Sequence, residues 1–160
     1  MIFDILSDAF FAAVAAMGFS ALSSPVRSSY LYCALIAAAG HSLRFVLMNT
    51  SADMSVVPAS VLAALVVGVL AVLLSPHART PAETFLFPSL LPMIPGIYAY
   101  RAFGGLVMCL LHGSESGVFM HYFYLLATNG LTCICVILGM VVGSTAPIFI
   151  LRRISFSATR

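Results

Sequence analysis

Apolar residues fill this chain in five long segments that are separated by short polar connections. A helix needs roughly 20 apolar residues to cross the hydrocarbon core of a bilayer, and each segment is close to that length or longer. The pattern therefore predicts an all-α fold, an integral membrane bundle of five transmembrane helices in a single domain over residues 1–160. The expected spans cover residues 3–23, 28–48, 56–74, 81–111 and 118–151.

The fourth segment contains closely spaced prolines. Pro88, Pro92 and Pro95 follow one another at spacings of four and three, and Gly96 comes directly after the last. A proline inside a helix removes a backbone donor and clashes with the carbonyl four residues earlier, which costs about 3 kcal/mol. In hydrocarbon such a break persists only where protein or a wet cavity surrounds it. We therefore expect the fourth helix to be broken at Pro92–Gly96, and its first half either crosses the membrane or re-enters it.

The arginines indicate how the bundle is oriented. Arg27 lies between the first two spans and Arg79 between the third and fourth. Three more arginines follow the last span: Arg152, Arg153 and Arg160. The charged residues at the opposite ends of the spans are acidic: Asp4, Asp8, Asp53 and Glu115. Because basic residues gather on the cytoplasmic side, we expect the N-terminus outside and the C-terminus in the cytoplasm.

The composition excludes several classes of protein. The chain is 62% hydrophobic and 8% charged, whereas a soluble domain has about 25% charged residues. A net charge of +2 is too small and too dispersed to indicate binding to nucleic acid. The sequence also shows no catalytic constellation, no metal-ligand spacing and no phosphate-binding loop, so we expect no enzyme, no metal and no cofactor.

Two ionisable residues of the second span are the first candidates for function. His41 and Arg44 lie three residues apart and so share one face of a helix. Ionisable groups at this depth normally face the bundle interior or a watery cavity. Arg44 would bind an anionic group through its guanidinium, and histidine titrates near neutral pH, which makes His41 a candidate for proton coupling. Structural hydrogen bonding, or extension of Arg44 towards the headgroups, is the alternative.

The broken helix and the last span add further candidates. A half-helix that begins near Gly96 would present backbone N–H groups and the positive end of its dipole to a carboxylate. A purely structural kink is the alternative. In the fifth span, Asn129 and Thr132 are neighbours that either line a cavity or bond between helices. The predicted substrate-binding residues are Arg44, His41, Pro92, Pro95, Gly96, Tyr100, Asn129 and Thr132.

Small residues recur at helical spacing in several spans. Gly139 and Gly143 form a small-xxx-small motif, which allows two helix backbones to approach closely in a membrane. We expect this motif to contact a neighbouring helix or a second subunit.

Several short motifs, in their order and spacing, resemble the threonine/serine exporter family and most closely its short, membrane-only subunits. These motifs are Pro25-Val26-Arg27, Cys33-Ala34-Leu35 with Gly40-His41 and Arg44, Pro92-Met93-Ile94-Pro95-Gly96-Ile97 with Tyr100, Thr128-Asn129 with Leu131-Thr132, and Arg152-Arg153. The full exporter of that family resembles two five-helix halves, which are fused or split over two chains. The longer half bears a soluble hydrolase-like domain that this sequence lacks.

The resemblance implies a bacterial inner-membrane protein that works with a longer partner subunit and exports a small carboxylate or amino acid. The short subunit is similar to the one that takes part in bacterial export of succinate. Arg44 and the break at Pro95–Gly96 are two features that suit an anion, so we favour a dicarboxylate over threonine or serine. Because the chain has no ATP-binding loop, we expect an ion gradient, protons favoured, as the energy source. The alternatives are a non-transporting scaffold subunit of a membrane complex and a homo-oligomeric passive channel.

Overall fold

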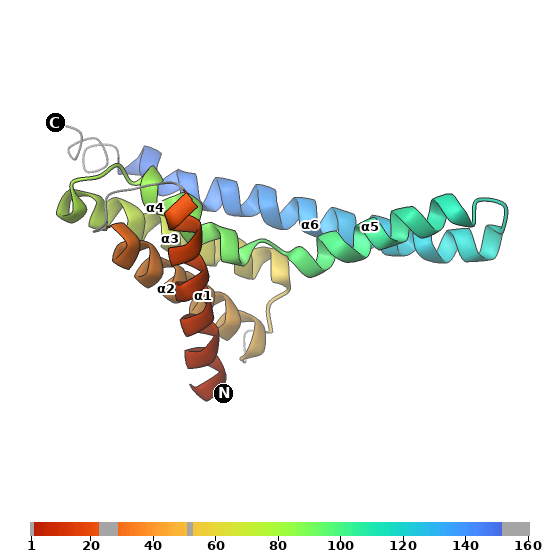
Figure 1. Cartoon of the computed structure of the whole chain (residues 1–160), viewed down its shortest axis with the longest axis horizontal. Helices are drawn as coiled ribbons and strands as arrows, with labels where there is room; N and C mark the ends of the chain where they lie inside the picture. The colour runs from red at the N-terminus through yellow and green to blue at the C-terminus, as the bar shows by residue number, and fades with distance from the viewer. Residues whose placement is uncertain (1, 23–28, 51–52, 152–160) are drawn as a thin grey trace. The chain divides into compact units, whose positions relative to one another are not determined.

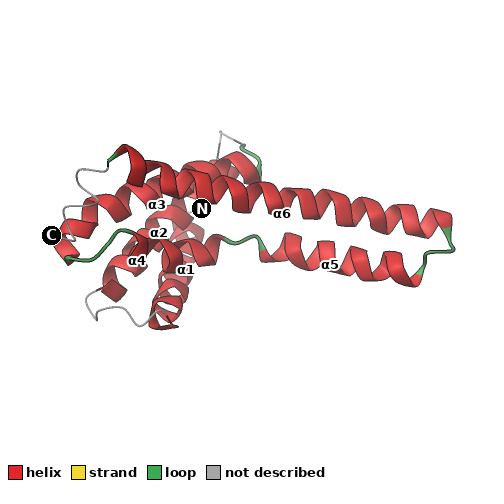
Figure 2. Ribbon diagram, turned by 90° about the horizontal axis from the view of Figure 1, so that it is seen from above, coloured by secondary structure: helices red, strands yellow, loops and turns green. Residues whose placement is uncertain are grey.

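The structure, a computed structural model, describes residues 2–22, 29–50 and 53–151. Over these ranges the regular structure is helical and contains no strand (Figures 1 and 2). The elements follow in the order α1 (Ile2–Leu22), α2 (Ser29–Asn49), α3 (Val56–Ala78), α4 (Glu83–Leu90), the 3₁₀ turn η1 (Leu91–Met93), α5 (Gly96–Leu111) and α6 (Ser116–Ile150). The prediction of an all-α fold is confirmed.

The five predicted spans correspond to these helices. Four of them, α1, α2, α3 and α6, are long and apolar enough to cross a membrane, and the bent pair Glu83–Met93 and Gly96–Leu111 supplies a fifth if it counts as one span. The 35 residues of α6 would extend over about 50 Å at 1.5 Å per residue, more than the roughly 30 Å hydrocarbon core requires. The helix continues through Pro147 without interruption.

The orientation of the bundle stays a prediction. Arg27, Arg152, Arg153 and Arg160 lie outside the described residues, as do Pro25 and Val26 of the first family motif.

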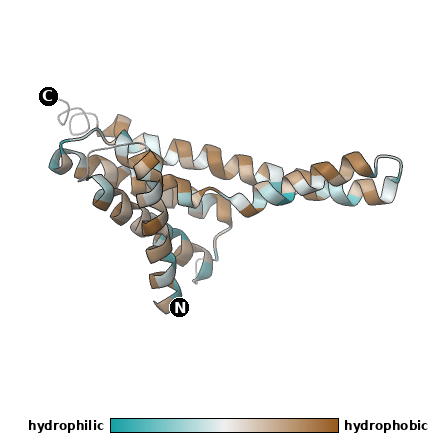
Figure 3. Ribbon diagram, viewed as in Figure 1, coloured by the Kyte–Doolittle hydropathy of each residue, from teal (hydrophilic) through white to brown (hydrophobic). Residues whose placement is uncertain are grey.

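Hydrophobic residues predominate along the helices (Figure 3). Many large apolar side chains are exposed, and many of the buried ones are small. Phe3, Leu110 and Ile150 are each more than 70% exposed. By contrast, the residues with no exposed surface include Ala16, Ala37, Ala59, Ala63, Ala64 and Ala71. This distribution suits a bilayer, where lipid covers the large side chains and small residues let the backbones approach.

The chain divides into two compact units, which we describe separately. The first contains Met1–Met93 and Gly139–Arg160, and the second contains Ile94–Leu138. In the first unit α2 packs against α1, α3, α4 and η1, so it occupies the centre of that unit. In the second unit α5 and the beginning of α6 form a hairpin (Figure 2). A Cβ atom on Gly105 would lie 2.9 Å from the Tyr122 carbonyl oxygen, which shows how closely the two backbones approach.

Glycines mark the closest helix contacts of the first unit. A Cβ atom on Gly68 of α3 would collide with the carbonyl of Ser144 in α6. On the opposite side of this contact, a Cβ atom on Gly143 would lie 2.7 Å from the Val61 carbonyl oxygen, and one on Gly139 would lie 2.5 Å from the Val61 side chain. The Gly139-x-x-x-Gly143 motif therefore packs on α3, a neighbouring helix of the same chain.

Candidate functional site

The proline break leaves backbone carbonyls without their helical partners. Pro95, which precedes α5, has φ −78° and ψ 68°, the values of an inverse γ-turn. Accordingly, the Gly96 N–H donates to the Ile94 carbonyl at 2.8 Å. In a continuous helix it would donate to Pro92, and the residue at position 95 would donate to Leu91. Because proline has no N–H, the break has more acceptors than donors.

Two side chains from α2 bind these carbonyls. The Arg44 Nη1 group donates to the Met93 carbonyl at 2.6 Å, and His41 Nε2 lies 3.3 Å from the Pro92 carbonyl oxygen. A cation is stabilised at the carbonyl end of a helical segment, where the backbone dipole is negative. The predicted pair His41 and Arg44 therefore lies together, and it meets the break at Pro92.

Asp8 of α1 completes the cluster. Its Oδ2 atom is 2.5 Å from His41 Nδ1, and the His41 and Asp8 side chains are 16% and 25% exposed. The Arg44 Nη2 group lies 3.1 Å from His41 Nε2. One aspartate, one histidine and one arginine thus form a continuous polar network on two helices and η1.

Asp8 is the residue of this polar network that the sequence reasoning missed, because it was taken as an acidic residue at the outer end of the first span. A usable signal was present. The three buried residues of α1 are Ala12, Ala16 and Ser20, and Asp8 precedes them at the same spacing of four. This spacing places Asp8 on the face of α1 that packs into the bundle.

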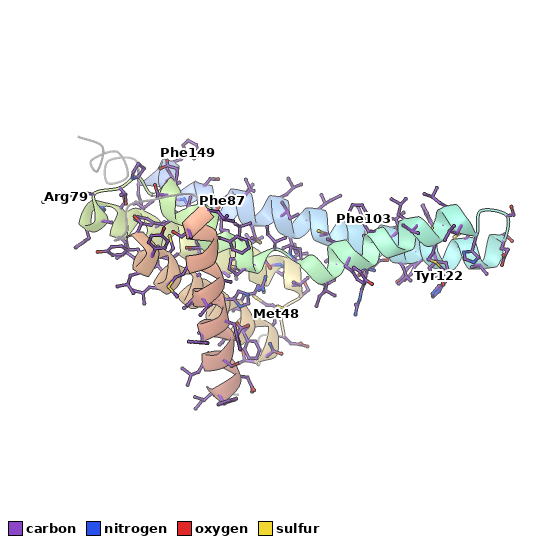
Figure 4. All side chains as sticks on the ribbon, viewed as in Figure 1. Met48, Arg79, Phe87, Phe103, Tyr122 and Phe149 are labelled. Carbon is purple, nitrogen blue, oxygen red and sulfur yellow. The ribbon has the colours of Figure 1, made fainter. Side chains whose placement is uncertain are left out.

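The cluster lines a cavity of about 180 Å³ at the end of α2 that carries Met48 (Figure 4). The volume accommodates several water molecules or a small carboxylate. Its walls are formed by Asp8, His41, Arg44, Phe45, Met48 and Asn49. Ionisable groups inside a membrane protein normally face the bundle interior or a water-filled cavity, and this cluster lies at such a position.

The start of α5 offers fewer backbone donors than its sequence suggests. The N–H groups of Tyr98 and Ala99 both donate to the Pro95 carbonyl, at 3.1 and 3.2 Å, and that of Gly96 is bonded to Ile94. These three N–H groups are engaged locally. The break thus supplies carbonyl oxygens to the polar network, whereas binding of a carboxylate at Pro95 and Gly96 stays a prediction.

The other predicted site residues lie in the second unit and form separate local contacts. The Asn129 amide donates to the Leu125 carbonyl and the Thr132 hydroxyl to the Thr128 carbonyl, so both described bonds stay within α6. Tyr100 is 80% exposed. It lines a mainly apolar cavity of about 390 Å³ within the second unit, together with residues that include Tyr122 (Figure 4). A role for Tyr100, Asn129 and Thr132 in substrate binding stays a prediction.

Comparison with known proteins identifies the family. The model of a family described as "Threonine/Serine exporter, ThrE" matches residues 8–150, a range that begins at Asp8 and includes the whole polar network. An uncharacterized protein of Haemophilus influenzae is 34% identical over 115 residues, which are 72% of this chain and 38% of that relative. The chain therefore spans well under half the length of this relative. No solved structure matches the chain.

Matched over nearly all of its length and built from apolar helices, the chain belongs to the threonine/serine exporter family and is a multi-pass protein of the bacterial inner membrane.

Proposed function

We propose that this chain is one membrane half of a secondary exporter of small carboxylates, with a succinate-like dicarboxylate as the favoured substrate. The observation that carries the proposal is Arg44, a cation at a small cavity inside a transporter unit. Arg44 would bind the substrate carboxylate, and His41 and the Pro92 carbonyl would hold the surrounding network in place.

The Arg44 guanidinium has further N–H donors that can bind a substrate. It carries five N–H donors in a planar fork, and its described contacts are one bond to the Met93 carbonyl and one approach to His41. The remaining donors suit a carboxylate, which binds arginine through two parallel hydrogen bonds. While the cavity is empty, Asp8 on the other side of His41 balances the arginine charge. That balance reduces the cost of holding a cation at this depth.

Threonine or serine is the second candidate substrate, because Asp8 gives the cavity one acceptor for an ammonium group. We favour a dicarboxylate because the cavity holds a cation with donors left over, Arg44, while the carboxylate that lines it, Asp8, already faces His41 through Oδ2. A carboxylate adds to the remaining donors of Arg44, whereas an ammonium group would share Asp8 with His41.

A longer subunit with a soluble hydrolase-like domain would supply the other half of the exporter. The matched segment makes up 38% of the Haemophilus influenzae relative, so most of that relative has no counterpart in the match to this chain. We further propose that the N-terminus lies outside and the C-terminus in the cytoplasm. In that orientation the cavity, near the start of α1 and the end of α2, lies towards the outer face.

Efflux measurements test this proposal. Cells are loaded with labelled succinate, threonine or serine, and efflux is compared with and without this chain and its longer partner. We expect faster succinate efflux only when both chains are present. Unchanged efflux of all three compounds refutes the proposal. Efflux by the partner alone would indicate a scaffold subunit, and conduction by this chain reconstituted alone would indicate a passive channel.

A further inference from the structure

We infer that Asp8 and His41 together form a proton-binding site that controls the availability of Arg44. This inference rests on the proposed function only for the identity of the ligand that Arg44 receives. The protonation of His41 can be measured without any transport.

His41 Nε2 has two neighbours that require opposite protonation states. Arg44 Nη2, at 3.1 Å, can only donate a hydrogen bond, so it needs a bare Nε2. The Pro92 carbonyl oxygen, at 3.3 Å, can only accept one, so it needs a protonated Nε2. A single nitrogen atom cannot satisfy both neighbours at once. Its proton therefore selects between the arginine and the helix break.

Asp8 acts as a positioning residue: because it binds Nδ1, the proton that His41 gains or loses is the one on Nε2. Its carboxylate lies 2.5 Å from Nδ1, and an ionised carboxylate can only accept. Nδ1 consequently carries a hydrogen in both states of the network. The second nitrogen, Nε2, is left to gain or lose a proton.

Proton uptake then changes the network in a defined way. The proton forms a new N–H bond at Nε2, and the hydrogen bond from Arg44 Nη2 is lost. The new N–H donates to the Pro92 carbonyl, the acceptor that the γ-turn at Pro95 has left without its helical donor. Arg44 keeps its bond to Met93 and turns its Nη2 group towards the cavity. The cluster changes from neutral to one positive charge.

Few other ionisable groups face His41 within the described part of the first unit. On α1 the nearest after Asp8 is Asp4, an exposed residue one turn earlier, and on α2 it is Arg44. The ionisable residues of α3 and α4, His77 and Glu83, lie near the other end of α2. Gly40 packs on Val67, more than two turns from His77, and Cys33 packs on Thr84, next to Glu83. Segments η1 and 139–150 contain no ionisable side chain.

The proton and the carboxylate should therefore favour each other's binding. When His41 is protonated, a bound carboxylate meets one more arginine donor and a cluster with one net positive charge, so it binds more tightly. Linkage requires that the carboxylate strengthens proton binding to His41 by the same factor. If binding requires the proton, the apparent dissociation constant of succinate rises about tenfold for each pH unit above the midpoint, because the competent fraction falls by that factor.

Nuclear magnetic resonance of ¹⁵N-labelled histidine tests the inference. The full-length protein is purified into lipid nanodiscs together with the subunits that accompany it, and the His41 signal is assigned by its loss in His41→Gln. We expect the tautomer with hydrogen on Nδ1 at high pH and the doubly protonated ring at low pH. Succinate should move the midpoint to higher pH. A His41 ring with hydrogen on Nε2 at high pH, or a ring that does not become doubly protonated at low pH, would overturn the inference. A midpoint insensitive to succinate would instead count against succinate as the ligand and so against the proposed function.

Two substitutions separate proton binding from a merely structural role. In Asp8→Asn the amide oxygen can still accept from Nδ1 but the negative charge is gone, so the His41 midpoint should differ from that of the wild-type protein. Asp4→Asn, the same change one turn earlier, should leave the midpoint in place. If Asp8→Asn and Asp4→Asn gave the same midpoint, Asp8 would have no part in the site.

Discussion

Replacing Arg44 with glutamine should weaken substrate binding far more than it weakens the fold. The substitution removes the guanidinium that donates to the Met93 carbonyl at 2.6 Å and that lines the cavity beside His41. Glutamine is shorter and uncharged, so it cannot replace both contacts. In the wild-type protein the Met93 contact holds Arg44 at the wall of the cavity.

The expected magnitude follows from the lost bonds. A hydrogen bond to a charged group contributes about 1.5–3 kcal/mol, and the carboxylate would lose at least one such bond. A loss of about 2–3 kcal/mol corresponds to a 30- to 150-fold weaker affinity, since roughly 1.4 kcal/mol is a factor of ten. Arg44→Lys keeps the positive charge but loses the planar set of N–H donors that binds a carboxylate through two hydrogen bonds. An ammonium can bind either the Met93 carbonyl or the substrate well, so its effect should be intermediate.

Succinate efflux from vesicles, measured over a range of substrate concentrations, gives KM and the maximal rate separately. Arg44→Gln should raise KM, while size-exclusion chromatography shows the same amount of folded protein. Arg79→Gln is the matched control, because Arg79 is an exposed residue at the end of α3, and it should leave KM unchanged. An unaltered KM with less folded protein in Arg44→Gln would show that Arg44 only ties α2 to η1, and the binding role would be refuted.

Three further predictions concern packing, the break and orientation. Gly68→Leu should destabilise the protein by about 1–3 kcal/mol, because the new side chain collides with Ser144. Gly104→Leu is the control and should have no such effect, since a Cβ atom there meets nothing within 4 Å. Equal thermal stability of the two variants in detergent would contradict the described α3–α6 contact. Pro95→Ala restores a donor and favours a continuous helix by up to about 3 kcal/mol, so the Pro92 carbonyl should regain Gly96 as its partner and succinate efflux should fall at least tenfold; wild-type efflux would show that the break is only a kink. In a chain without its native cysteines, Glu115→Cys should react with an impermeant maleimide added to whole cells and Arg79→Cys should not, and the reverse labelling would overturn the proposed orientation.

The helices and the break could be predicted from the sequence because both depend on local chemistry. A run of about 20 apolar residues spans a bilayer as a helix whatever surrounds it. Likewise, a proline without an N–H cannot continue the hydrogen-bond ladder, and the structure breaks the fourth span at Ile94 and Pro95, inside the predicted range.

The polarity of the break was harder to predict. Sequence reasoning emphasised the positive start of α5, yet Gly96, Tyr98 and Ala99 use their N–H groups locally. Instead, the γ-turn at Pro95 draws the Gly96 N–H to Ile94, which leaves the Pro92 carbonyl without its helical donor. His41 lies near the Pro92 carbonyl oxygen, and Arg44 donates to the Met93 carbonyl beside it.

Asp8 shows where local reasoning fails. An acidic residue in the second turn of a helix gives the same local sequence pattern whether its side chain faces the headgroups or the bundle interior. Only the packing of α1 on α2 decides between the two, and it brings Asp8 to His41 across 33 positions of sequence. The spacing of Asp8 from the buried residues Ala12 and Ala16 carried part of this information.

A structure of the purified exporter with succinate bound, determined by electron cryomicroscopy at low pH, tests the central claim most directly. We predict density for the carboxylate within hydrogen-bond distance of Arg44, in the cavity beside Asp8 and His41, with Arg44 Nη1 still on the Met93 carbonyl. Succinate bound elsewhere in the exporter, while Arg44 keeps its contact with His41, would contradict the claim.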